Sequence, residues 1–227
     1  MMQVIPRPIF ADRRDAGQHL AEATRKTSDQ PALVMGLARG GVIVAAEVAR
    51  ALTIPLDVLV VRKLGAPQSE EVAIGAITAD GALHLVEDII RWLEITTSYL
   101  EREIDKQSRL AAEREAIYRR GRQRPEISDR NVILVDDGMA TGATMVAAAR
   151  SARKRGARFV TVAVPVGSQG SCHDLRGEAD DVVCLHQPDP FWSVGLFYQD
   201  FSQVTDDEVL EALDEGVERA GHAARGA

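Results

Sequence analysis

Cysteine is scarce in this chain. Cys172 and Cys184 are the only two among 227 residues, and they lack the close spacing that a structural zinc site requires. Two isolated cysteines of this kind indicate a reducing compartment and no structural zinc. We expect each of them to act as a small side chain in the core or in a loop.

Long apolar runs and an excess of positive charge are also missing. No run approaches the roughly 20 apolar residues that span a membrane, and the first residues carry no apolar region typical of a signal peptide. The net charge of −7 argues against a general nucleic-acid binder. We therefore expect a cytoplasmic protein that binds neither a membrane nor nucleic acid.

The composition is that of an ordinary globular protein, with 45% hydrophobic and 27% charged residues. Short apolar runs alternate with helical patterns, which predicts a mainly parallel sheet covered by helices on both faces. Buried strands are expected at residues 31–37, 55–61, 132–135, 159–165 and 181–185, two further strands at 72–77 and 83–86, and helices at 13–27, 41–52, 145–155 and 172–176.

Residues 88–120 contain neither glycine nor proline and are rich in Glu, Arg, Ala and Leu. This pattern predicts one long helix or two. Its apolar positions are sparse, so the helix must pack against something to be stable. Two interpretations remain open, an arm across the surface of the core and a contact in a homodimer. We expect the last dozen residues of the chain to be frayed.

The most informative stretch is VILVDDGMATGAT, residues 132–144. Its aliphatic residues predict a buried strand that ends at Asp136 and Asp137, on the edge where open α/β sheets bind their ligands. Adjacent carboxylates there are costly to desolvate unless vicinal hydroxyls or Mg²⁺ use them. The following loop offers two glycines and the hydroxyls of Thr141 and Thr144, and it opens onto a helix N-terminus, which favours a phosphate. These features suit a ribose 5-phosphate, although taken alone they also fit a strand–turn–helix whose Asp pair caps the helix.

This stretch resembles the signature of the type I phosphoribosyltransferases, the binding motif for phosphoribosyl pyrophosphate (PRPP). In that family the acidic pair holds the ribose 2′- and 3′-hydroxyls and the loop holds the 5-phosphate. The residues that would bind PRPP here are Asp136, Asp137, Gly138, Met139, Ala140, Thr141, Gly142, Ala143 and Thr144.

The resemblance covers most of the chain. Within the family, the chain is similar to uncharacterised bacterial phosphoribosyltransferase-like proteins. It implies an α/β fold with a parallel five-stranded sheet and helices on both faces. It further implies one domain over residues 1–227, with a small hood made of residues 1–11 and 181–201 and a helical insertion at about 88–121.

A second motif, GLARGG at residues 36–41, places two glycines and an arginine at a helix N-terminus, which suits a cluster of anionic oxygens. The resemblance implies that this loop binds pyrophosphate, with a strained peptide just before the basic residue. The alternative is a structural turn whose arginine is a surface charge. The residues concerned are Ala38, Arg39, Gly40 and Gly41.

Arg62 and Lys63 follow the second strand, where members of the family often place a basic residue against the pyrophosphate. Residues 62–75 are loop-like in sequence. We expect them to form a mobile flap that closes over the reaction and excludes water.

The aromatic residues of the chain concentrate in residues 186–201. In similar purine enzymes an aromatic ring stacks on the base just before a Val-Gly pair, which implies a base-binding role for Phe191 or Trp192 together with Val194. The resemblance assigns the downstream acid to Asp200, and we group it with Asp136 and Asp137 as candidate metal ligands. His186 is the one histidine worth testing as a base contact. The alternative is that these rings are core residues beneath the edge of the sheet.

Two departures from the family pattern concern the acceptor. Ala140 stands where 6-oxopurine enzymes carry an acidic residue, and no lysine occurs in residues 166–169, where those enzymes read an exocyclic oxygen. The resemblance thus implies a Mg²⁺-dependent transfer of phosphoribose from PRPP to an unidentified base or amine, with Asp136, Asp137, Arg39 and Lys63 as catalytic residues. A regulatory protein that senses PRPP without turnover, and a hydrolase that releases ribose 5-phosphate, are the alternatives.

Overall fold

The computed structural model describes residues 7–25 and 33–223. The predicted hood residues 1–6, the predicted end of the first helix at 26–27 and the predicted start of the first strand at 31–32 lie outside this range. Among the described helices, none combines the length and the apolar character needed to cross a membrane.

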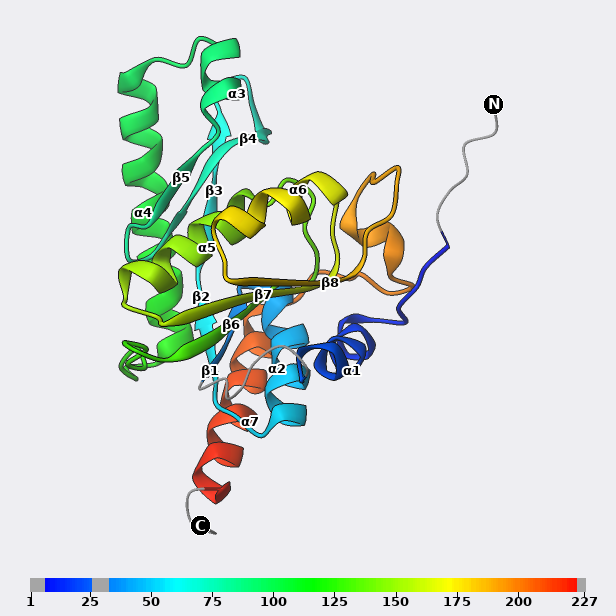
Figure 1. The fold of residues 1–227 in the computed structure, drawn as a ribbon. Coiled ribbons are helices and arrows are strands. Elements are labelled where there is room, and N and C mark those ends of the chain that lie inside the picture. The colour runs from blue at the N-terminus through cyan, green and yellow to red at the C-terminus, as the bar shows by residue number, and fades with distance from the viewer. Residues whose placement is uncertain (1–6, 26–32, 224–227) are drawn as a thin grey trace.

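The centre of the molecule is a parallel sheet of five strands (Figure 1), which confirms the predicted fold class. In spatial order the strands are β2 (Leu56–Leu59), β1 (Leu33–Leu37), β6 (Asn131–Val135), β7 (Phe159–Val166) and β8 (Asp181–His186). All four neighbouring pairs run in the same direction. Every residue of β1 is buried, as expected for a central strand covered on both faces.

Helices cover both faces of this sheet, as Figure 1 shows. One face carries α1 (Arg13–Thr24), α2 (Gly40–Leu52) and α7 (Asp206–Ala223), and its core includes Val34, Ile133 and Ala163. The other face carries α5 (Ala143–Lys154) and α6 (Gln169–Asp174). Two short 3₁₀ turns, η1 (Leu175–Gly177) and η2 (Val194–Phe197), follow α6 along the chain. Alternate strand residues therefore serve the two cores.

The segment expected to be a loop-like flap is instead a β-hairpin. Strands β3 (Val61–Ala66) and β4 (Ser69–Thr78) pair antiparallel, and β5 (Leu83–Leu85) extends them to a separate three-stranded sheet. The expected loop conformation was wrong because the hairpin has a small core of its own, in which Leu64 and Ile74 are fully buried. Closure of this segment over the reaction stays a prediction. A shift of register around Gly65 interrupts the alternation of apolar and polar residues from which a strand would be recognised.

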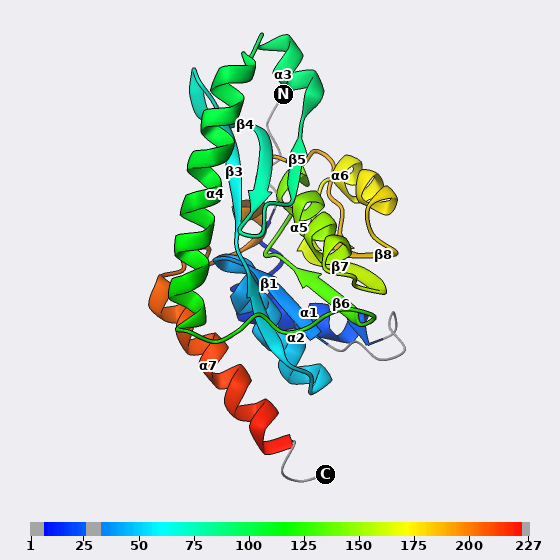
Figure 2. The ribbon, with the colours of Figure 1, turned by 90° about the vertical axis from the view of Figure 1, so that its left-hand side faces the viewer.

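The long helical region is two helices, α3 (Glu87–Trp92) and α4 (Thr97–Arg119), and Thr96 caps the second by accepting a hydrogen bond from the backbone of Tyr99. Figure 2 shows α4 running beside β3 and reaching α7 at its lower end. Its first turns, including Leu100 and Ile104, pack on the core of the hairpin. The helix thus forms an arm across the surface of the core, one of the two interpretations of the sequence.

The C-terminal region was also predicted incorrectly. Residues 216–223, expected to be frayed, continue α7, while 224–227 lie outside the described residues. Val209, Leu210 and Leu213 bury the helix against the same core as α2. These buried residues precede the segment, and at its start Gly216 lies against β2, since a Cβ atom on it would be 3.1 Å from the Leu56 side chain.

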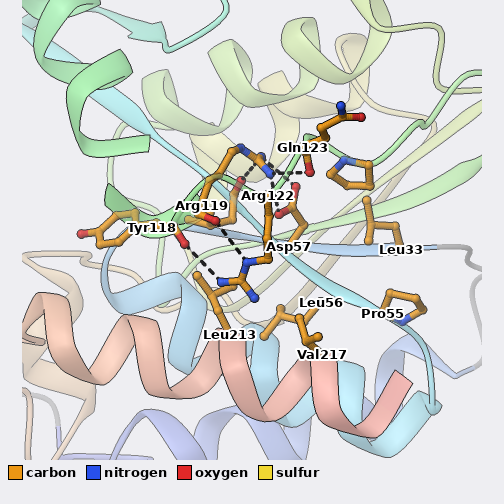
Figure 3. A pocket seen from close by; sticks show the side chains of 12 residues that line it. Leu33, Pro55, Leu56, Asp57, Tyr118, Arg119, Arg122, Gln123, Leu213 and Val217 are labelled. Carbon is orange, nitrogen blue, oxygen red and sulfur yellow. Dashed lines mark hydrogen bonds and ion pairs between the residues drawn. The ribbon is translucent and has the colours of Figure 1, made fainter. Parts of the chain in front are cut away.

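A polar network joins α4 to the edge strand β2. Arg119 donates to both carboxylate oxygens of Asp57 at 3.2 and 2.9 Å, and it also donates to Glu115. Arg124 donates to Glu115 at 2.5 and 2.7 Å. In Figure 3, Arg119 and Asp57 lie at a cavity of about 170 Å³ between β2, the end of α4 and α7. The network fixes the lower end of the arm to the core.

The network generates a prediction for stability. Burial alone would raise the pKa of Glu115, but hydrogen bonds from Arg124 and Arg119 outweigh it and lower that pKa. A folded-state pKa below the unfolded one stabilises the protein above the unfolded value, roughly pH 4.3, and this stability is lost as pH falls through the folded pKa. Glu115→Gln should therefore reduce the free energy of unfolding at pH 7 by about 2–3 kcal/mol. The difference in unfolding free energy between the Glu115→Gln variant and the unmutated protein should shrink below that pH.

Denaturant titrations at neutral and acidic pH measure both effects. Glu113→Gln is the matched control, because Glu113 lies on the same helix and is exposed. Equal stability of the two variants at pH 7 would contradict the assignment.

Candidate active site

The two predicted binding motifs meet at one edge of the sheet. Strands β1 and β6 are neighbours with Gly36 opposite Val135, so the loops that follow them leave the sheet side by side. A Cβ atom on Gly40 would lie 1.9 Å from Oδ2 of Asp137, and one on Gly41 would lie 2.8 Å from Oδ1 of Asp136. Only glycine permits this approach of the second loop to the acidic pair.

The loop after β1 begins with a cis peptide bond between Ala38 and Arg39, at the position where the resemblance implied an unusual peptide. Arg39 is the N-cap residue of α2, and its side chain is 30% exposed. The guanidinium lies 4.0 Å from Asp206, which accepts hydrogen bonds from Arg114 and Tyr118. The Arg39 side chain thus lies near the start of α7, at an aspartate that α4 also contacts.

Asp136 and Asp137 share a partly desolvated position. Burial raises the pKa of Asp136 well above its usual range, and the neighbouring charge of Asp137 raises it further. Burial also raises the pKa of Asp137, while Arg13 opposes this through its charge and a hydrogen bond. Ligand groups that donate hydrogen bonds or carry positive charge would stabilise the ionised pair.

Arg13 is a site residue that the sequence reasoning missed. Its Nε donates to Oδ2 of Asp137 at 2.7 Å, although 124 positions separate the two residues. The only local signal was its place in the first turn of α1, just after the capping Asp12. Nothing in that position indicates a partner on a distant strand.

Lys63 and Arg62 point to opposite faces of β3, as adjacent strand residues do. The charge of Lys63 acts on Asp136, where it lowers the pKa. Arg62 instead donates to Gln107 of α4 at 2.9 Å, and Gln107 donates to Glu103. Of the two predicted basic residues, the structure therefore brings Lys63 toward the acidic pair and engages Arg62 with the arm.

Hydrogen bonds to β7, and to residues at the start of α6, hold the loop after β6 in place. The backbone of Met139 donates to Val166, and the hydroxyls of Ser168 and Ser171 both donate to the carbonyl of Ala140, at 2.8 and 2.7 Å. Gly142, with φ of +77°, turns the chain into α5 as its N-cap residue. These contacts leave the N-terminus of a 12-residue helix at the site.

The side chains of this loop divide into two groups. Thr141 is exposed and Thr144 is half-buried, so their hydroxyls lie at or near the surface. Met139 and Ala143 are buried in the core, so only their backbone groups could reach a ligand.

The two hood segments contact each other and the site. Backbone hydrogen bonds join Ile9 and Phe10 to Phe197, and Gln199 to Phe10. The hydroxyl of Tyr198, a second residue that the sequence reasoning missed, donates to the backbone carbonyl of Asp137 at 2.5 Å. The hood is thereby attached directly to the acidic pair.

The three predicted base-binding residues have different surroundings. A Cβ atom on Gly138 would lie 2.4 Å from Val194, so Val194 packs against the loop after β6. Phe191 packs on Phe197 with ring centroids 5.5 Å apart, whereas Trp192 is 57% exposed. The aromatic segment therefore supplies both core rings and an accessible one.

Two other candidates lie in the hood. His186 contacts the ring of Phe10 edge-on at 5.6 Å. Asp200 is exposed, and one of its carboxylate oxygens accepts the backbone N–H of Ser202 at 2.9 Å. Within residues 7–25 and 33–223, no three His, Cys, Asp or Glu side chains come together to hold a metal ion. Among these described residues, Asp200 is therefore not gathered with Asp136 and Asp137 into one such group, and the role of each as a metal ligand stays a prediction.

The comparisons with known proteins agree with this geometry. Two curated proteins of Mycobacterium tuberculosis, from two strains and both provisionally named phosphoribosyl transferases, are 45% identical to the chain over 206 residues, or 91% of it. The chain spans 46% of their length.

The crystal structure of TT1426 from Thermus thermophilus is 46% identical, with a TM-score of 0.77, and the match covers 91% of this chain and 98% of that one. The family model described as the phosphoribosyl transferase domain matches residues 11–201. The chain therefore belongs to the phosphoribosyl transferase domain family, as residues 132–144 predicted.

Proposed function

We propose that the protein transfers phosphoribose from PRPP to a nitrogenous base or an amine and releases pyrophosphate. The observation that carries the proposal is the convergence of both motif loops on Asp136 and Asp137, with Gly40 and Gly41 in close approach to the carboxylates. A ligand with a phosphate, vicinal hydroxyls and a diphosphate in that order matches this sequence of sites.

The ribose and its 5-phosphate occupy the side formed by β6 and α5. Asp136 and Asp137 accept hydrogen bonds from the two ribose hydroxyls, whose donation also offsets the cost of keeping adjacent carboxylates ionised. The backbone N–H groups of residues 138–144, the hydroxyls of Thr141 and Thr144, and the positive end of the α5 dipole bind the phosphate.

The diphosphate occupies the side formed by the loop after β1. Backbone groups of residues 38–41 and the Arg39 side chain bind its oxygens, and Lys63 approaches from the hairpin. Because Arg62 is engaged with Gln107, we assign the charge stabilisation from β3 to Lys63. Arg62 would take part only after releasing α4.

The acidic pair also fits Mg²⁺. Carboxylate oxygens are the ligands this ion prefers, and within the described part of the chain no side chain donates a hydrogen bond to Asp136, which accepts only the N–H of Asp137. Asp136 and Asp137 would hold the ion near the ribose hydroxyls. When bound, Mg²⁺ supplies positive charge that neutralises the leaving diphosphate.

The chemical step is a displacement at C1 of the ribose. The C1–oxygen bond breaks, the diphosphate leaves with the electron pair, and a nitrogen of the acceptor forms the new bond. The protein contributes by positioning the ribose and by stabilising the developing negative charge on the diphosphate. The hairpin and the hood would exclude water from the electron-deficient carbon.

The acceptor enters from the hood. Trp192 and Phe191 offer ring faces to a flat heterocycle, and Val194 borders the phosphate loop. Ala140 in place of an acidic residue makes a 6-oxopurine the weaker candidate among bases. Because the chain carries only two cysteines, both free, we place the activity in the cytoplasm.

Turnover tests this proposal directly. The protein is incubated with PRPP, Mg²⁺ and a panel of purines, pyrimidines and amines, and pyrophosphate release is measured. We expect release that depends on one acceptor class. PRPP binding without turnover for any acceptor would instead favour a sensor, and ribose 5-phosphate formed without an acceptor would favour a hydrolase.

A second experiment separates Lys63 from Arg62. Once an acceptor is known, Lys63→Ala should lower kcat/KM for PRPP about 10- to 100-fold, because one charged contact to the diphosphate is lost. Arg62→Ala, on the opposite face of β3, should lower it less than about threefold. An equal or larger loss in the Arg62 variant would contradict the assignment of the two side chains.

A further inference from the structure

Arg13 joins the acidic pair to the hood. Its guanidinium donates to the Asp137 carboxylate at 2.7 Å and to the backbone carbonyl of Ser202 at 2.8 Å. It also lies over the ring of Phe201, with 3.9 Å between Cζ and the ring centroid. The side chain is only 11% exposed, so these contacts are largely shielded from solvent.

Two side chains donate hydrogen bonds to oxygen atoms of Asp137. Arg13 donates to Oδ2 of the carboxylate, and the Tyr198 hydroxyl donates to the backbone carbonyl. Tyr198 and Phe201 pack against each other with ring centroids 4.9 Å apart and ring planes tilted by 35°. The two contacts therefore belong to one packed unit of α1 and the hood.

The space around Oδ2 is closed on the remaining side. A Cβ atom at Gly40 would lie 1.9 Å from this oxygen and 2.7 Å from Nε of Arg13. The loop after β1 thus packs against the ion pair itself. Rotation of the carboxylate would break the Arg13 contact or collide with this loop.

We propose that Arg13 is a positioning residue, which fixes the Asp137 carboxylate so that Oδ1 faces the ribose hydroxyls. The inference rests on the proposed function, because it assigns the hydroxyl-binding side of the same site. Arg13 touches neither the reacting carbon nor the diphosphate, and acts through Asp137. Its contacts with Phe201 and Ser202 make this orientation depend on a correctly packed hood.

The neighbouring arginine provides a matched control. Arg14 lies on the same turn of α1, but its side chain is half exposed and faces Glu47 of α2 at 3.5 Å. Arg14→Gln therefore removes the same charge from the same helix without touching Asp137.

The test compares two sugar phosphates that differ only in one hydroxyl. Ribose 5-phosphate and 2-deoxyribose 5-phosphate are titrated by calorimetry into the unmutated protein and into the Arg13→Gln, Arg13→Lys and Arg14→Gln variants. A merely structural role of Arg13 would weaken both ligands equally. A positioning role changes the ratio of their affinities, because only that ratio reports the hydroxyl contact.

We expect the unmutated protein to prefer ribose 5-phosphate by about tenfold, the size of one hydrogen bond to a charged group. Arg13→Gln should reduce this ratio to near one, Arg13→Lys should restore part of it, and Arg14→Gln should leave it unchanged. PRPP with Mg²⁺ is titrated in parallel.

The outcomes separate the inference from the proposed function. If the unmutated protein binds PRPP and the ratio survives in Arg13→Gln, the inference is overturned and the proposed function stands. If the unmutated protein does not bind PRPP, both are overturned. If Arg13→Gln fails to melt cooperatively, Arg13→Lys decides, because it keeps the positive charge but lacks the guanidinium that contacts Asp137, Ser202 and Phe201 together. A ratio in that variant equal to the ratio of the unmutated protein overturns the inference.

Discussion

Two adjacent carboxylates at the end of a buried strand impose the main constraint on this structure. Burial works against the charge of both Asp136 and Asp137. Arg13 and Lys63 offset this cost from two sides, and they come from segments far apart in the chain, α1 and the hairpin. This arrangement of distant cations around a desolvated acidic pair is what supports the proposed binding site.

The scaffold follows from that constraint. The parallel pairing of β1 with β6 places both motif loops at one edge, and glycine at position 40 allows them to touch. The hairpin would present Lys63 from a fixed position, because its own core and α4 hold it. The hood is joined to the acidic pair by Tyr198, whose hydroxyl donates to the backbone carbonyl of Asp137. Polar contacts also join the arm to its neighbours. Arg114 and Tyr118 of α4 donate to Asp206 of α7, and Arg119 donates to Asp57 of β2.

Prediction from sequence succeeded where the signal is local. The five strands of the central sheet appear as short apolar runs, and residues 132–144 combine strand, acidic pair and loop in one continuous stretch, so the fold class and the family could be predicted. The hairpin, α7, Arg13 and Tyr198 depend on contacts between segments that are distant in sequence. Arg62 and Lys63 could not be distinguished until the structure showed Arg62 bonded to Gln107 of α4 and the charge of Lys63 acting on Asp136.

The most direct test of the account is calorimetric titration of PRPP with Mg²⁺ into the protein and into the double variant Asp136→Asn/Asp137→Asn. Asp129→Asn, in the exposed turn before β6, is the control for loss of an acidic side chain. The account predicts binding by the unmutated and control proteins and a loss of about a hundredfold or more in the double variant. Equal binding by the double variant, or no binding by the unmutated protein, would contradict the claim that this acidic pair holds the ribose of PRPP.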